Sequence, residues 1–403
     1  MKISFARLAL AALCLIGSTS FAQTRPPAAP RLPIQADSSV FRNLNSTPTY
    51  TRSNKLTPDG NAGTTQQRLR SVPNFSSSFT FQGQVFPFTM VGQDPHRLGT
   101  TMIDTSYVPI SFFFDEFVDQ NGNNIVIDMG PINDEILHSP NFEAFPYTSG
   151  NTQFGDAVQR AEFFSTVKNA PSFVAWHTLL ERPRILTPVQ VEVPFFSSLV
   201  FQTPDGSFVA LIDINFMNSQ LNTLLQTEGV RTTELPLFVT RNTVYGDFFA
   251  GNPLDCCIGG FHSAFETQQI GNIHFVQTFA FATALDSNVA NFVFGDPTAF
   301  ADVAPLSHEV SEWMDDPFVN NIVPSWEFPG LPFVACDNFL ETGDPVENLP
   351  NPSFPVTLHG FTYHPQTEAL LQWFSRESPS SAIGGAYSYP GNNLTTPSTV
   401  CPF

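Results

Sequence analysis

One amphipathic segment near residue 308 constrains the fold of this chain more than any other feature. Apolar side chains recur there at intervals of three and four residues, which predicts a helix with a single apolar stripe. Asp302 is expected to cap the start of this helix, and Pro317 is expected to end it. Such a helix must pack its stripe against an apolar core. The stripe consists of Val303, Leu306, Val310 and Trp313.

The other face of the predicted helix carries the pattern H-E-x-x-E. His308 and Glu312 are one helical turn apart on this face, and Asp315 joins them there. The pattern resembles the H-E-x-x-H helix of metallopeptidases, in which residues at this spacing bind zinc and the intervening glutamate is the general base. Glu312 replaces the second histidine, and carboxylate oxygen is also an accepted zinc ligand. The alternative interpretation is a solvated acidic face.

Residues 1–22 have the pattern of a secretory signal peptide. Lys2 and Arg7 supply positive charge, an apolar run follows from Leu8 to Gly17, and Ala22 suits cleavage before Gln23. The apolar run is too short to cross a membrane comfortably, and no later run approaches the length of a transmembrane helix. We therefore expect a protein secreted to the periplasm or the extracellular space, with no membrane span.

Four cysteines follow the predicted cleavage site. An even number in an oxidising compartment predicts two disulfides. Cys256 and Cys257 are adjacent, and a bond between them would be strained. We therefore expect each of them to pair with Cys336 or Cys401. A cysteine-rich metal site is the alternative, but no C-x-x-C spacing supports it.

Composition and missing motifs exclude several classes of function. The formal charge of −19 argues against nucleic acid and anionic membrane surfaces as partners. The chain has no G-x-S-x-G, P-loop or G-x-G-x-x-G motif, which leaves serine hydrolysis of that type, nucleotide hydrolysis and dinucleotide binding without support. Its 42 phenylalanines predict a large apolar core.

The chain divides into a leader and one domain. Residues 23–76 are rich in proline, serine, threonine and asparagine, which predicts a disordered leader. Residues 77–403 contain no linker, so we expect a single domain of the mixed α+β class. Its N-terminal part is predicted to be rich in β-strands. Asn121-Gly122 lies between two strand-like runs and predicts a hairpin turn in preference to a calcium loop.

The pattern alternates between strand and helix in the middle of the chain. This order predicts a mixed sheet with helices packed on it, one of them the metal-binding helix. The predicted helices lie within 150–167 and 218–228, the second closed by Gly229, and the predicted strands span 207–216, 235–240 and 273–284.

Several motifs give residues 148–403 a resemblance to known proteins. These motifs are GNTQFGDAVQRAEFF, CCIGGFHSAF, LSHEVSEWMDDPFVNN and CDNFLETGDP. Their order resembles that of secreted bacterial proteins regarded as zinc metallopeptidases with an H-E-x-x-E motif. The later portion is also distantly similar to the plant phosphate-induced, or EXORDIUM-like, proteins. Those are extracellular proteins linked to growth and not established as peptidases.

The resemblance implies a set of site residues. His308 and Glu312 would bind the metal, and Glu309 would be the base. Because a catalytic zinc needs three protein ligands, the segment ETGD would supply the third. Glu341 is expected to be that ligand, with Asp344 as a ligand or a supporting group. The alternative for both is an acidic turn around a glycine.

His262 is a further candidate for the site. It follows Gly259 and Gly260, and glycines allow close approach of the backbone to a cleft. The imidazole could then bind the metal or donate a hydrogen bond to an oxyanion. The alternative is a histidine buried in the core with its hydrogen bonds satisfied.

Taken together, these patterns predict a secreted zinc-dependent hydrolase, a metallopeptidase that acts on a peptide or protein substrate. Glu309 would be the general base toward a metal-activated water. The alternative is a non-enzymatic extracellular binding or structural protein with a structural metal or none. A catalytic zinc keeps an open coordination position, whereas a structural zinc is closed by four protein ligands.

Overall fold

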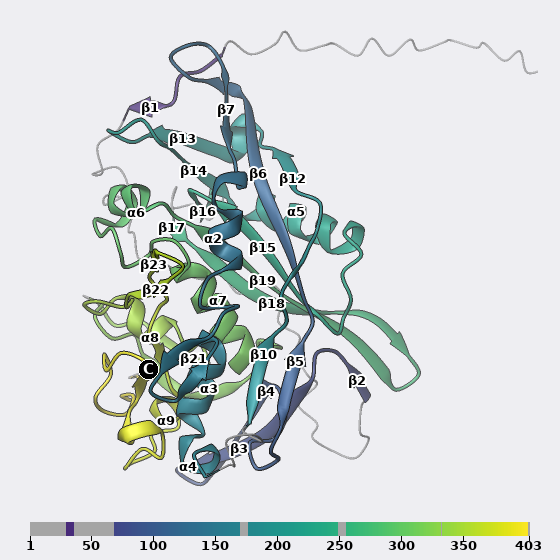
Figure 1. Cartoon of the computed structure of the whole chain (residues 1–403), viewed down its shortest axis with the longest axis vertical. Coiled ribbons are helices and arrows are strands. Elements are labelled where there is room, and N and C mark those ends of the chain that lie inside the picture. Colours follow the sequence, from purple (N-terminus) through teal and green to yellow (C-terminus); the bar gives the residue numbers. More distant parts are fainter. Residues whose placement is uncertain (1–29, 36–67, 170–175, 249–254, 332, 402–403) are drawn as a thin grey trace, which may run out of the picture.

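Two β-sheets form the framework of the protein, and helices cover their faces (Figure 1). The larger sheet has eight strands and the smaller sheet has five. Both sheets contain parallel and antiparallel pairs, so the prediction of a mixed α+β fold is confirmed. The structure is a computed structural model that describes residues 30–35, 68–169, 176–248, 255–331 and 333–401.

The larger sheet is built around the long strand β6, which runs along much of the long axis of the molecule (Figure 1). β6 pairs in parallel with β15, and β15 pairs in parallel with β19. β18 and β19 form an antiparallel hairpin. The strands of this sheet are β2 (Arg68–Arg70), β6 (Thr105–Val118), β7 (Asn124–Ile127), β11 (Arg184–Ile185), β12 (Val189–Glu192), β15 (Leu235–Arg241), β18 (Gly260–Ile270) and β19 (Ile273–Ala284).

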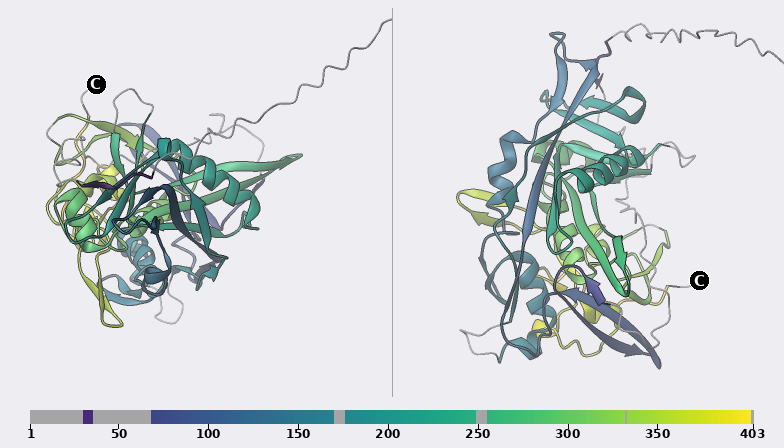
Figure 2. Two further views of the ribbon diagram at one scale, coloured as in Figure 1. Left: turned by 90° about the horizontal axis from the view of Figure 1, so that it is seen from above. Right: turned by 90° about the vertical axis from the view of Figure 1, so that its right-hand side faces the viewer.

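The two faces of this sheet differ in the size of their side chains. Successive side chains of a strand point to opposite faces, and β19 alternates phenylalanine with alanine. Phe279 and Phe281 join the apolar cluster that contains α5 (Ile214–Thr227). Ala280 and Ala282 join the cluster that contains α7 (Ala304–Asp315). Helix α7 therefore packs on the face with small side chains. In Figure 2, α5 lies on the opposite side of the sheets from α2 (Asn133–Leu137) and α3 (Phe154–Glu162).

The smaller sheet corrects one prediction. The strands on either side of α5, β14 and β15, were expected in one mixed sheet, but they lie in different sheets. β15 ends at Arg241 and β16 begins at Thr243, and the residue between them, Asn242, has a φ of 47°. Asparagine tolerates this left-handed conformation, which redirects the chain from one sheet into the other. The smaller sheet contains β1 (Ile34–Gln35), β13 (Ser198–Gln202), β14 (Phe208–Asp213), β16 (Thr243–Asp247) and β17 (Asp255–Ile258).

Part of the predicted leader is ordered. β1 pairs with β13 and β2 pairs with β19, both in parallel. These segments have few apolar side chains, but an edge strand is held by backbone hydrogen bonds that do not depend on them. Composition therefore missed the strand pairing, and it also missed Val72 of the leader, which is buried in the apolar cluster that contains Leu306. The predicted signal peptide and residues 23–29 and 36–67 of the predicted leader lie outside the described residues.

The N-terminal part of the domain is rich in strands, as expected. β3 (Asn74–Phe81) and β4 (Gln84–Val91) form a hairpin whose turn residues, Gln82 and Gly83, have φ values of 51° and 81°. β6 and β7 form the hairpin that Asn121-Gly122 predicted, with Gly122 at a φ of 83° in its turn. A side strand pair consists of β5 (Thr100–Ile103) and β10 (His177–Leu180).

The predicted helices are present, with changes at their ends. α5 begins four residues earlier than expected because Asp213 accepts a hydrogen bond from the backbone of Phe216 and caps it. Among the described residues, no helix has the length and apolar character needed to cross a membrane. The remaining elements are η1 (Gly130–Ile132), β8 (Phe145–Tyr147), β9 (Gly150–Thr152), α4 (Phe164–Val167), η2 (Phe195–Ser197), α6 (Ser287–Phe294), β20 (Ile322–Glu327), β21 (Cys336–Phe339), α8 (Asp344–Glu347), β22 (Val356–Leu358), β23 (Phe361–Tyr363), β24 (Glu368–Ala369), α9 (Leu371–Phe374), η3 (Ile383–Gly385) and β25 (Ser388–Tyr389).

Two disulfides are present as predicted, but the expected pairing is wrong. Cys256 bonds to its neighbour Cys257 within β17, and Cys336 bonds to Cys401. The second pair forms because the C-terminal segment runs beside β20, where the backbone of Cys401 donates a hydrogen bond to the carbonyl of Ser325. The Cα atoms of Cys336 and Cys401 are thereby 5.8 Å apart, an ordinary spacing for a disulfide.

The Cys336–Cys401 bond should contribute measurably to stability. Replacing both cysteines by serine should lower the free energy of unfolding by about 2 to 4 kcal/mol, because the bond closes a long chain loop. Denaturant unfolding of the wild type and the double variant measures the difference. Non-reducing peptide mapping should find Cys336 linked to Cys401. A peptide that joins Cys336 to Cys256 or Cys257 would contradict the pairing.

Candidate metal centre

Helix α7 is buried along its whole length, including its polar face. All twelve residues from Ala304 to Asp315 are buried. Its apolar stripe packs on the alanine face of the large sheet, as the spacing predicted. The polar face is covered by β18 and by the segment around α8. The alternative of a solvated acidic face is therefore wrong, since His308 and Glu309 are 0% exposed and Glu312 is 2% exposed.

The ends of α7 differ in part from the prediction. The helix ends at Asp315, just before Pro317, as expected. Asp302 does not cap the first turn. Its carboxylate instead accepts a hydrogen bond from the backbone of His364 at 2.9 Å and contacts the His364 ring at 2.7 Å. Asp302 therefore connects the start of α7 to the segment after β23.

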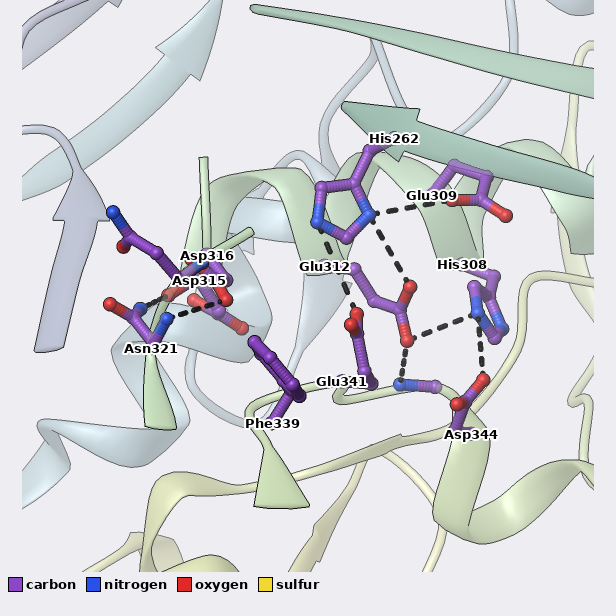
Figure 3. A network of polar contacts seen from close by, with 12 residues as sticks. His262, His308, Glu309, Glu312, Asp315, Asp316, Asn321, Phe339, Glu341 and Asp344 are labelled. Carbon is purple, nitrogen blue, oxygen red and sulfur yellow. Dashed lines mark hydrogen bonds and ion pairs between the residues drawn. The ribbon is translucent and has the colours of Figure 1, made fainter. Parts of the chain in front are cut away.

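Three predicted ligands converge on one point. The Nε2 atom of His308 lies 3.1 Å from a carboxylate oxygen of Glu312 and 3.6 Å from one of Asp344 (Figure 3). Two ligands about 2.1 Å from a tetrahedral zinc ion are about 3.4 Å apart, which is close to both distances. His308, Glu312 and Asp344, here called the first triad, could therefore hold a metal ion.

A second group of three side chains shares Glu312 with the first. The Nδ1 atom of His262 lies 3.6 Å from Glu309 and 3.5 Å from the second carboxylate oxygen of Glu312 (Figure 3). His262, Glu309 and Glu312, here called the second triad, also have the separations of metal ligands. Glu312 therefore stands between the two histidines, with one oxygen toward each.

Strand register explains the orientation of His262. On β18, Gly260 lies opposite Ala282 and His262 lies opposite Ala280. Directly opposed residues of an antiparallel pair project from the same face, so the histidine projects toward α7. Phe261, between them, points into the core on the other face. The predicted place of His262 beside the H-E-x-x-E helix therefore follows from the alternation of the strand.

Glu341 occupies a different place from the one expected. It was the preferred third ligand beside His308 and Glu312, but Asp344 takes that position. Glu341 instead faces the Nε2 atom of His262 at 4.0 Å. The chain turns after Glu341 and enters α8, which brings the first residue of that helix, Asp344, to His308.

Two glycines allow the close packing of the site. A Cβ atom on Gly343 would lie 2.2 Å from Nδ1 of His308, and one on Gly260 would lie 2.9 Å from a carboxylate oxygen of Glu309. The backbone of Gly343 also donates a hydrogen bond of 3.1 Å to Glu312. The sequence predicted that glycine beside His262 allows a close approach of the backbone. It did not predict that Gly343 makes room for the ring of His308.

The site concentrates negative charge in a buried environment. Burial raises the pKa of Glu309 to about 7, although His262 and His308 partly oppose this effect. Burial would also raise the pKa of Glu312, but His308 and His262 outweigh it and hold that pKa well below its usual range. Burial together with Glu312 raises the pKa of Asp344 well above its usual value. The carboxylate between the two histidines is thus the one most strongly held in its charged form.

Further buried carboxylates surround the site, and the sequence analysis missed most of them. Glu347 and Glu368 are 3% and 0% exposed, and burial raises the pKa of each well above its usual value. Glu347 lies three residues after Asp344 on α8, a spacing that could have signalled it. Glu368 lies on the short strand β24 and had no such signal. Asp315 shares the polar face of α7 but contacts Gln159 and lies in neither triad.

The residues present fit a divalent metal ion. Imidazole nitrogen and carboxylate oxygen are ordinary zinc ligands. Both carboxylate oxygens of Glu309 and one of Asp344 are buried without a hydrogen-bond partner, and a bound cation would compensate such groups. The ring of His308 fills the space that the missing side chain of Gly343 leaves. The type of donor atoms, the unsatisfied carboxylate oxygens and the close packing all favour a bound divalent cation.

Comparisons with known proteins do not extend this description. No family model, curated protein or solved structure matches the chain. The resemblance to zinc metallopeptidases and EXORDIUM-like proteins therefore stays a prediction, and the site is interpreted from its own geometry.

Replacing Gly343 by alanine should disturb the first triad. The backbone there has a φ of −81°, which alanine adopts readily, so the effect should come from the collision with His308. We expect a loss of unfolding free energy of about 1 to 3 kcal/mol, as in overpacked cores, and a smaller rise in melting temperature on adding zinc. Gly130→Ala is the control, because its new Cβ would meet only the neighbouring side chain of Asp128. Equal behaviour of the two variants would contradict the role of Gly343.

Glu162 gives a prediction for pH dependence. It is 1% exposed, it accepts a hydrogen bond from the backbone of Leu371, and burial raises its pKa from 4.5 to about 8. The folded state therefore binds this proton more tightly than the unfolded state. The contribution of the Glu162 proton to the free energy of unfolding is fully present below about pH 4.5. It is lost as the pH rises through about 8.

Glu162→Gln should flatten this dependence, because glutamine keeps the hydrogen-bond acceptor and cannot ionise. Between pH 5 and pH 8 the variant should lose on the order of 2 kcal/mol less unfolding free energy than the wild type. Denaturant unfolding at both pH values measures the difference, with Glu181→Gln, at an exposed site, as the control. Parallel curves for wild type and Glu162→Gln would contradict the assignment.

Proposed function

We propose that this protein is a secreted zinc-dependent hydrolase, of the metallopeptidase type. The observation that supports this most directly is the position of Glu309. Its carboxylate is fully buried, has no hydrogen-bond partner on either oxygen, and follows a ligand of the first triad in the sequence. A general base must keep an unblocked acceptor oxygen near the proton that it removes.

The residues of the first triad would hold the metal. His308, Glu312 and Asp344 are three protein ligands, the number that leaves a catalytic zinc one position for water. When bound, zinc supplies Lewis acidity toward a carbonyl oxygen and lowers the pKa of a water molecule. The backbone of Gly343 fixes Glu312 through its hydrogen bond, so this ligand is oriented before any metal binds.

Glu309 and His262 would handle the protons. Glu309 accepts a proton from the attacking water and passes it to the leaving amine of a peptide. His262, whose Nδ1 atom is 3.6 Å from Glu309, would position that carboxylate and donate to a developing oxyanion. Peptides or proteins are the substrate class that this arrangement favours.

Secretion is part of the same proposal. Two disulfides are typical of proteins that fold in an oxidising compartment. They agree with the export that the first 22 residues predict. The −19 charge supports solubility and argues against nucleic acid as a partner.

A structural metal site is the second candidate, and burial is the observation that favours it. The most exposed side chain of the two triads is Asp344, at 10%. A site this enclosed resembles one that protein ligands close completely, and Glu347 is a nearby carboxylate that could complete it. In this alternative the protein is a non-enzymatic extracellular binding or structural protein.

Two substitutions distinguish the base from a ligand. Glu309→Gln keeps the size of the side chain but removes the proton acceptor, so peptide hydrolysis should fall by about 100-fold or more while the metal of the first triad remains. His308→Ala should lose that metal and the stability that comes with it. Cleavage of a peptide library and metal analysis of the purified protein are the measurements.

Glu181→Gln provides the matched control, since it makes the same chemical change at an exposed site. It should keep activity and metal content. Full activity in Glu309→Gln would rule out Glu309 as the base. Absence of peptide hydrolysis in the wild type, together with a lower melting temperature of His308→Ala, would favour the structural metal.

A further inference from the structure

The second triad has its own ligand geometry, separate from the first. His262 comes from β18, whereas Glu309 and Glu312 come from adjacent turns of α7. Its histidine–carboxylate distances, 3.5 and 3.6 Å, match those expected for two ligands of one ion as well as the distances of the first triad do. Neither His308 nor Asp344 is needed to complete this group.

The ring of His262 is oriented as a metal-binding histidine would be. Its Nδ1 atom faces Glu309 and Glu312, and its Nε2 atom faces Glu341. Histidine ligands commonly direct the second ring nitrogen at a carboxylate, which fixes the ring and its tautomer. Glu341, which is not part of the first triad, is the carboxylate that faces the second ring nitrogen of His262.

Unsatisfied and fully buried atoms point into the same space. Both oxygens of Glu309 lack a hydrogen-bond partner, and the side chain is 0% exposed. Gly260 has no side chain to fill the space, since a Cβ there would meet Glu309 at 2.8 Å. The carboxylate is therefore packed in place beside His262 with no hydrogen bond of its own, a position that a bound cation would stabilise.

The carboxylates around the two histidines are arranged for two ions. Four carboxylates lie within 4.0 Å of the two histidine rings, and Glu312 directs one oxygen to each triad. The four carboxylates are Glu309, Glu312, Glu341 and Asp344.

We infer that the second triad is a second divalent-cation site, joined to the first by Glu312 as a bridging carboxylate. The inference rests on the proposed function and adds a means of regulation to it. A second ion bound through Glu309 would lower the basicity of the carboxylate that accepts the proton of water. Excess metal should therefore inhibit hydrolysis, while the first ion supports it.

Manganese binding tests the inference without any substrate. Purified mature protein, stripped with a chelator, is titrated with Mn²⁺ and followed by calorimetry and electron paramagnetic resonance. We expect two ions per chain and, at two equivalents, the spectrum of an exchange-coupled pair, because ions in carboxylate-bridged sites are about 3.5 to 4 Å apart. Glu309→Gln should bind one ion with an uncoupled spectrum, and Glu181→Gln should behave as the wild type.

The outcomes separate this inference from the proposed function. One ion in the wild type would overturn the second site and leave the single-metal hydrolase intact. No bound ion would overturn both. Two uncoupled ions in the wild type, or two coupled ions in Glu309→Gln, would place the second ion elsewhere. The wild-type spectrum decides the question even if a variant does not fold.

Discussion

The rest of the site depends on the complete burial of α7. Its apolar stripe packs on a sheet face where β19 presents alanine, and these small side chains let the helix lie close to the strands. The polar face is then enclosed as well, so the carboxylates on it cannot be stabilised by bulk water. Buried charge must be compensated by opposite charge, hydrogen bonds or a bound cation. The two histidines supply part of this compensation.

Glu312 connects the elements that meet at α7. One of its oxygens is near His308 and accepts a hydrogen bond from Gly343, and the other is near His262. Strand β18, helix α7 and the turn before α8 are thereby held around a single carboxylate. Loss of that residue would leave two buried histidines with fewer anionic partners. The same position would let Glu312 be shared by the two proposed cations.

The sequence predicted the parts of the site that lie on one element. His308, Glu309 and Glu312 are fixed by helical periodicity, and their spacing alone placed them together. The choice between Glu341 and Asp344 was different, because it depends on how the turn at Gly343 directs the chain. The cysteine pairing failed for a related reason. The proximity of Cys336 and Cys401 is set by the C-terminal segment lying along β20, which local sequence does not encode.

By itself the sequence determined the amphipathic helix, the hairpin turn at Asn121-Gly122 and the presence of two disulfides, because these follow from periodicity, turn chemistry and composition over short distances. The tertiary structure alone decided that the acidic face is buried, that β14 and β15 enter different sheets, and that His262 meets α7. These outcomes depend on strand register and on packing between segments far apart in the chain. A histidine in a strand has no partner until the register of β18 against β19 aims it at a helix some fifty residues away.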